Sequence, residues 1–178
     1  TMTYNTSNFK AELKKAEEWL SREYSQVHTG RATPMILDSI MVDSYGQMMP
    51  IKNVAAVSVE DPKTLRIAPW DKSAIKEIEK AIQSANLGLS VVSDGEGVRA
   101  IFPMLTTENR QKLVKVLKDK LEDGRITVRK ARQEAMDTLD EMSEDDAKRA
   151  KDDIQKCVDE ANKNLEAIFG KKETEVMS

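Results

Sequence analysis

Three long stretches of the chain repeat apolar residues at alternating intervals of three and four positions. The longest is predicted to form one uninterrupted helix from Thr107 to about Met142. Its apolar positions make a narrow seam of the kind that packs against other helices. The seam consists of Leu113, Leu117, Leu121, Gly124, Val128, Ala131, Ala135, Leu139 and Met142. A helix with such a seam requires partner helices.

The other two stretches supply these partners and complete a predicted three-helix bundle. The first helix begins near Thr6 or Ser7 as N-cap and ends at Gly30. The third begins at Ser143, in a sequence resembling a capping box, and ends at Gly170. A tight turn near Ser143 makes the second and third helices antiparallel. The two seams are Phe9, Leu13, Ala16, Leu20, Tyr24 and Val27, and Ala147, Ala150, Ile154, Cys157, Ala161, Leu165 and Ile168.

Residues 31–104 follow a different pattern, with short β-rich runs around one amphipathic helix at 72–85. The runs are 40–42, 48–51, 54–59, 65–68 and 98–102. We therefore expect an α+β protein. Its elongated three-helix bundle is built from 1–30 and 105–178, and a small α/β, β-rich domain of 31–104 is inserted between helices one and two.

Both crossings between these predicted domains carry a proline, which disfavours helix in the residue before it and stiffens the chain. Two adjacent connecting segments joining two rigid bodies form a restricted hinge. The hinges are expected at about 30–34 and 102–106, with hinge residues Gly30, Arg31, Ala32, Thr33, Pro34, Pro103, Met104, Leu105 and Thr106.

Composition and motifs argue against an enzyme. The chain is 33% charged and only 4% aromatic, which is typical of long solvated helices and not of an aromatic-lined pocket. It contains no nucleotide-binding glycine motif, metalloprotease motif or nucleophile elbow. One cysteine and one histidine cannot form a Cys/His zinc site. We expect no catalytic residue, metal or cofactor, and no membrane span or signal peptide, and hence a cytoplasmic protein.

Charge is distributed unevenly. The net charge is −3, yet nine basic and three acidic residues lie between Arg110 and Arg132. Lys118, Arg125, Arg129 and Arg132 fall within a wedge of roughly 60° beside the seam, at about 100° per residue. Glu122 can pair with the first two, but Arg129 and Arg132 have no carboxylate three or four positions away. Their partner is expected outside this helix, as an acid on another helix or a phosphate. Arginine suits phosphate because its planar fork binds two oxygens at once.

Two functions remain open on these residues. The first is contact with the backbone and shape of folded RNA, to which the sole histidine, His28, would contribute unless it is only a surface residue near the hinge. The second is a helical adaptor or chaperone-like interaction protein without RNA binding. The adaptor would leave its apolar seams exposed and self-associate, whereas the RNA-binding protein would be a closed monomeric bundle.

Several blocks of the chain resemble, in order, the ribosome recycling factors. They are TGRATP at 29–34, DSYG at 43–46, SVEDPKTL at 58–65, PWDKS at 69–73, LTTENR at 105–110 and VRKAR at 128–132. The resemblance implies an L-shaped, tRNA-like outline and a non-catalytic monomer. It implies binding to the post-termination ribosome at the subunit interface, with the bundle on large-subunit rRNA. With elongation factor G and its GTP hydrolysis, such a protein splits the subunits and releases mRNA and tRNA.

By this resemblance, Arg110, Arg129 and Arg132 are RNA contacts, joined on the same surface by Arg125, Lys118 and His28. The family usually has arginine where this chain has His28, Asn109 and Gln133. The RNA-binding surface is therefore expected to be less basic than usual. His28 is expected to make its end of that surface sensitive to pH.

Overall fold

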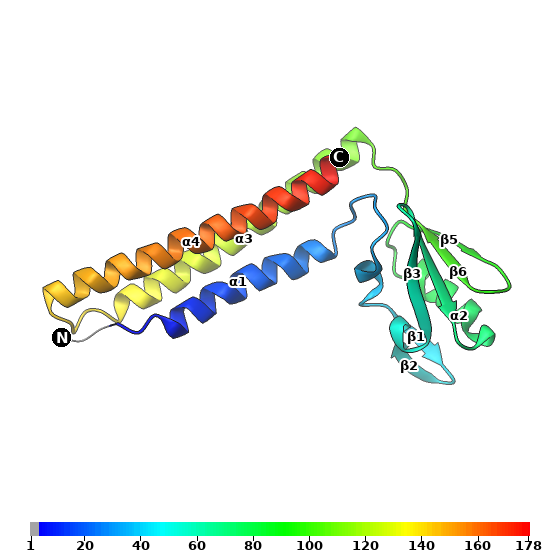
Figure 1. Ribbon diagram of the computed structural model, residues 1–178, viewed down its shortest axis with the longest axis horizontal. Helices are drawn as coiled ribbons and strands as arrows, with labels where there is room; N and C mark the ends of the chain where they lie inside the picture. The colour runs from blue at the N-terminus through cyan, green and yellow to red at the C-terminus, as the bar shows by residue number, and fades with distance from the viewer. Residues whose placement is uncertain (1–3) are drawn as a thin grey trace. The chain divides into compact units, whose positions relative to one another are not determined.

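The computed structural model describes residues 4–178, which form two compact units. The first unit joins the chain up to Tyr24 with Arg110–Ser178, and the second is Ser25–Asn109. Long helices make up the first unit, and strands with short helices make up the second (Figure 1). The predicted α+β class is confirmed. No helix within residues 4–178 is long and apolar enough to cross a membrane.

The first unit is a bundle of α1 (Ser7–Ser25), α3 (Thr107–Asp137) and α4 (Glu144–Met177). Its core is built from the predicted seams, and Leu20, Leu117, Ile154 and Leu165 have no exposed surface. Cys157 is only half-buried, because its neighbour Val158 takes the inward position on α4. The Ser143 hydroxyl accepts a hydrogen bond from the Asp146 N–H at 3.3 Å, which confirms the predicted start of α4.

The predicted ends of the second and third helices were wrong. α3 ends at Asp137, not Met142, because 3₁₀-type bonds tighten the chain there and turn Leu139 into the core. α4 continues through Gly170 to Met177. A glycine inside a helix costs about 1 kcal/mol relative to alanine, but the last turns are held by the fully buried Val176.

The first helix also ends earlier than predicted, at Ser25, although Gly30 has the left-handed φ of +79° that suits a glycine. Tyr24 lies one residue before the end of the helix, and its hydroxyl donates to the Leu117 carbonyl at 2.6 Å. Burial raises the pKa of Tyr24 to about 12. Trp19 lies half-buried beside the α1 seam.

The second unit contains a two-stranded hairpin and a four-stranded antiparallel sheet. Strands β1 (Met41–Ser44) and β2 (Gln47–Pro50) form the hairpin. Its turn residues Tyr45 and Gly46 both have positive φ, as a type I′ turn requires. The sheet has the order β3-β4-β6-β5, with β3 Ala55–Asp61, β4 Thr64–Pro69, β5 Ser90–Ser93 and β6 Val98–Ile101.

The predicted helix at 72–85 is divided in two. A 3₁₀ turn, Lys72–Ala74, leads into α2 (Ile75–Ser84), and the Asp71 carboxylate accepts from the Ser73 N–H at 2.9 Å to cap the turn. Two further 3₁₀ turns are Pro34–Leu37 and Ile51–Asn53.

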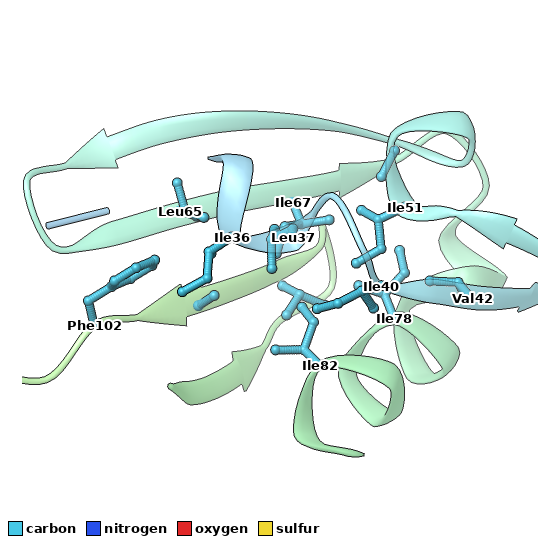
Figure 2. Close-up of a cluster of buried hydrophobic side chains, with 13 residues drawn as sticks. Ile36, Leu37, Ile40, Val42, Ile51, Leu65, Ile67, Ile78, Ile82 and Phe102 are labelled. Carbon is cyan, nitrogen blue, oxygen red and sulfur yellow. The ribbon is translucent and has the colours of Figure 1, made fainter. Parts of the chain in front are cut away.

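One face of the sheet, α2, the hairpin and the first 3₁₀ turn enclose the core of the second unit. Figure 2 shows Ile78 and Ile82 of α2 reaching into the same cluster as Val42 of β1. The cluster also contains Ile36, Leu37, Ile40, Ile51, Leu65, Ile67 and Phe102.

Residues 94–97 form the turn between β5 and β6. The Asp94 carboxylate accepts from the N–H groups of Glu96 and Gly97 at 2.8 and 3.0 Å and pairs with Arg66 at 2.8 Å. These hydrogen bonds hold the pKa of Asp94 well below its usual range. The loop is thus a structural turn.

Candidate nucleic-acid interface

The α3 flank carries three arginines, Arg125, Arg129 and Arg132, whose surroundings differ. The Arg125 guanidinium lies 2.8 Å from the Glu166 carboxylate of α4, whereas the Glu122 carboxylate on its own helix is farther away, at 3.9 Å. The main partner of Arg125 is therefore an acid on another helix, which its spacing to Glu122 did not predict. Arg125 links two helices of the bundle, and its charge is neutralised there.

Arg129 is the most open of the three, with 70% of its side chain exposed. Its nearest carboxylate is Glu122, seven residues earlier, at 3.9 Å. That residue falls outside the three-and-four spacing, which therefore did not predict the pair. At this distance an exposed ion pair contributes between nothing and about 1 kcal/mol. Arg129 is thus available to an external anion.

Arg132 is half-buried and oriented by a neutral group. Its Nε donates to Gln155 Oε1 of α4 at 3.0 Å, and Gln155 Nε2 donates in turn to Asp159 Oδ1 at 2.8 Å. Within residues 4–178, no carboxylate lies within 4 Å of the Arg132 guanidinium. The amide chain fixes the side chain without cancelling its charge, and its Nη donors are left for another partner. Sequence spacing alone carries no signal for Gln155.

Arg110 and Lys118 lie closer to the C-terminal end of α4. Arg110 Nη1 donates to the Met177 carbonyl at 3.2 Å, which places a cation at a helix C-terminus where it is favourable. Its Nε is buried without a hydrogen-bond partner. Lys118 borders a hollow of about 720 Å³ with Val114 and Met177. The expected Lys118–Glu122 ion pair is absent among the described residues.

His28 belongs to the second unit, whereas the basic residues of α3 belong to the first. Its Nδ1 accepts the Gly30 N–H at 2.8 Å, and its ring stands edge-on to Phe102 with centroids 5.2 Å apart. Its Nε2 is buried without a partner. Burial, and secondarily the Lys63 charge, lower the pKa of His28. The side chain is therefore a neutral packing group beside the first connecting segment.

Both connecting segments are attached to the same hairpin turn. The Ala32 N–H donates to the Pro62 carbonyl at 2.8 Å, and the Phe102 N–H donates to the Lys63 carbonyl at 2.7 Å. The segments also meet at Gly30, where an added Cβ would lie 3.4 Å from Leu105 Cγ. Beyond these points, the Thr106 hydroxyl accepts from the Asn109 N–H at 3.0 Å and caps α3.

The surface arginines of the bundle can bind an anion. Arg129 and Arg132 offer planar donors for phosphate oxygens. Among the residues that the structure describes, no group of three or more histidine, cysteine, aspartate or glutamate residues could hold a metal ion.

Comparison with known proteins points to one family. A family model described as "Ribosome recycling factor" matches residues 20–177. The ribosome-recycling factor of Caldicellulosiruptor saccharolyticus is 43% identical over 171 residues, covering 93% of each chain. A solution structure of the ribosome recycling factor matches with a TM-score of 0.80 and 33% identity, over 99% of each chain.

A second solved structure is similar over 97% of this chain and 96% of its own, with a TM-score of 0.64 and 35% identity. It describes the T. thermophilus ribosome recycling factor and the E. coli elongation factor G bound to the E. coli post-termination complex.

Proposed function

Because the chain belongs to the ribosome recycling factor family, we propose that it binds the post-termination ribosome and dissociates it into subunits. It does so together with elongation factor G and GTP, and mRNA and tRNA are released. The related T. thermophilus protein is described on the post-termination complex together with elongation factor G. The nucleotide is hydrolysed by the partner, so this chain acts without a catalytic residue or cofactor, in the cytoplasm.

Arg129 and Arg132 carry the RNA-binding part of this proposal. Arg129 is 70% exposed with one weak ion pair, and Arg132 is oriented by the neutral Gln155 amide. Two positive charges on one helix face without full countercharge suit the negative charge of an RNA backbone. Arg110 and Lys118 extend the same helix face toward the other end of the bundle. Arg125, already paired with Glu166, contributes less.

Movement of the second unit about the connecting segments supplies the mechanical step. Ala32 and Phe102 are tied to the Pro62–Lys63 turn, so these residues travel with the sheet. The bending is then concentrated in Gly30 and Arg31 and in residues 103–106. Elongation factor G would push on the second unit while the arginines hold the bundle on large-subunit rRNA.

The alternative adaptor function loses its premise. It required apolar seams open to a partner, but Leu117, Ile154 and Leu165 are fully buried within the bundle. The chain is accordingly proposed to act as a monomer.

The test removes the two arginines and measures affinity for purified 70S ribosomes. In the R129A/R132A variant, we expect the slope of log affinity against log salt to fall in magnitude by about 1.4–1.8, at 0.7–0.9 per lost phosphate contact. The thermal melt should remain nearly unchanged, because the Glu122 pair is weak and both side chains lie at the bundle surface.

The matched control is K14A/K15A, which removes the same charge from exposed positions on α1. It should leave affinity and salt slope near the wild-type values. If R129A/R132A binds with unaltered affinity, or if the wild-type affinity does not depend on salt, the proposed anchor is wrong.

A further inference from the structure

A groove on the second unit gathers side chains that RNA binding and hinge motion leave without a role. Two adjoining hollows, of about 360 and 520 Å³, share Asp43 and Glu77 in their walls. We name them together the Asp43–Glu77 groove. One end is bordered by Tyr45, Trp70 and Asp71, and the other by Met41, Met48 and Lys80.

Packing of the core forces the groove's side chains outward. Val42 of β1 and Ile78 of α2 are buried in one cluster, as Figure 2 shows. Because neighbouring residues on a strand point to opposite faces, Met41 and Asp43 face away from that cluster. Met48 pairs directly with Asp43 across the hairpin and lies on the same face. Glu77 stands on the flank of α2 that faces this side of the hairpin.

The aromatic end is exposed and yet fixed in place. Tyr45 is 88% exposed and Trp70 is 69% exposed. The Tyr45 hydroxyl donates to the Asp71 carboxylate, whose other oxygen accepts from the Ser73 N–H. These hydrogen bonds lower the pKa of Asp71, so the carboxylate is charged. Exposed aromatic rings beside methionines are typical of protein–protein interfaces, where both residue types are enriched.

The charges of the groove select the class of partner. Asp43, Asp71 and Glu77 border it, and Lys80 at the methionine end is the one cation among its described lining residues. Three carboxylates repel the phosphates of RNA. A guanidinium or ammonium group, by contrast, is attracted both by carboxylates and by the faces of aromatic rings.

We propose that the Asp43–Glu77 groove is a docking surface for a protein partner, which inserts an arginine or lysine side chain flanked by apolar residues. The cation lies between Asp43, Glu77 and the Trp70 ring, and the apolar neighbours cover Met41 and Met48. Because the partner is sought on the ribosome, the test rests on the proposed function.

The experiment places a photo-cross-linking residue, p-benzoylphenylalanine, at Ser84 on the rim of the groove. The full chain is irradiated with purified 70S ribosomes, with and without elongation factor G, and the cross-linked segment is identified by mass spectrometry. The same residue at Val92 of β5, which is exposed but outside the groove, is the control. We expect Ser84 to cross-link to a protein segment that has lysine or arginine next to apolar residues.

Two sets of substitutions then test the chemistry. D43N/E77Q removes both charges, while the amide introduced by D43N keeps an oxygen that can accept the Gly46 N–H in the turn, as the Asp43 carboxylate does. W70A removes the exposed ring. Each should reduce the Ser84 cross-link roughly tenfold and leave the Val92 product unchanged. Circular dichroism confirms that both variants fold.

The outcomes separate the two proposals. A chain that co-sediments with ribosomes but cross-links at Ser84 to rRNA, or to no protein, overturns the groove proposal alone. So does a protein cross-link that survives D43N/E77Q at full yield. A wild-type chain that fails to co-sediment overturns the proposed function and the groove proposal together.

Discussion

Gly124 lies at the middle of the α3 seam, and substituting it tests whether the bundle requires a glycine there. It is buried, and it faces Leu165 of α4. A glycine on a seam suggests that two helices approach too closely for a side chain. However, a Cβ built on Gly124 would lie 3.5 and 3.6 Å from the two terminal methyl groups of Leu165, which is ordinary van der Waals contact. The site therefore has room for a methyl group.

The Gly124→Ala variant should be more stable than the wild-type chain. Alanine is favoured over glycine inside a helix by about 0.8–1.0 kcal/mol, and burying one methyl group adds up to about 0.8 kcal/mol. We expect a net gain of about 1–1.5 kcal/mol in the free energy of unfolding, which raises Tm by about 2–6 °C for a chain of this size.

Trp19 makes the measurement specific to the bundle. It lies half-buried on α1, and Trp70 is the other tryptophan of the chain. In a Trp70→Phe background, tryptophan fluorescence during urea unfolding therefore reports the first unit. Gly170→Ala is the matched control, since no heavy atom lies within 4 Å of an added Cβ there. It should gain only the helix preference, about 1 kcal/mol. A Gly124→Ala variant less stable than the wild type would show that the helices do require the glycine.

Two further predictions concern the connecting segments. The pKa of His28 is lowered in the folded chain, so the unfolded chain takes up the proton first as pH falls. The stability that neutral His28 contributes is therefore present above the unfolded pKa of about 6.5 and is lost as pH falls through the folded pKa. In His28→Asn, where Oδ1 can accept the Gly30 N–H without titrating, unfolding monitored across this range should lack that loss, and an unchanged pH profile would contradict the assignment. Gly30→Ala and Gly88→Ala both force a side chain into positive φ, at +79° and +73°, and should each cost about 1–2 kcal/mol. Only the side chain added by Gly30→Ala also contacts Leu105. Gly30→Ala should therefore slow subunit splitting in a light-scattering assay with elongation factor G. Equal splitting rates for the two variants would show that Gly30 is not part of the hinge.

The faces of the helices were predictable because periodicity is a local property of the sequence. Every predicted α1 seam position is buried, and so are most of those on α3 and α4. The helix ends were not predictable in the same way, since they depend on contacts with distant residues. Leu139 leaves the helix to enter the core, and Val176 keeps the chain helical beyond Gly170. A glycine signal alone cannot reveal either contact.

In the candidate site, too, local spacing was predictable from the sequence and contacts between distant residues were not. The absence of local carboxylates predicted that the partner of Arg132 lies outside α3, but which side chain of α4 faces it depends on how the helices are rotated against each other. The acidic Glu166 meets Arg125 and the neutral Gln155 meets Arg132. The Asp43–Glu77 groove was missed for a related reason. Its aromatic, acidic and methionine side chains come from segments that only the folded hairpin and α2 bring together.

Arg125 and Arg132 differ in their partners, and the difference indicates a role for the Arg132 charge outside the bundle. Half-burying a guanidinium costs desolvation, which a carboxylate partner offsets and an amide offsets only in part. Arg125 has its carboxylate and is explained by the bundle alone. Arg132 has its direction set by Gln155 and, within the described chain, no countercharge within 4 Å. The Arg132 guanidinium is therefore oriented but lacks a countercharge among the described residues, and it lies on the same helix face as the exposed Arg129. An external phosphate would supply the missing electrostatic stabilisation, and the proposed anchor on rRNA provides such a phosphate.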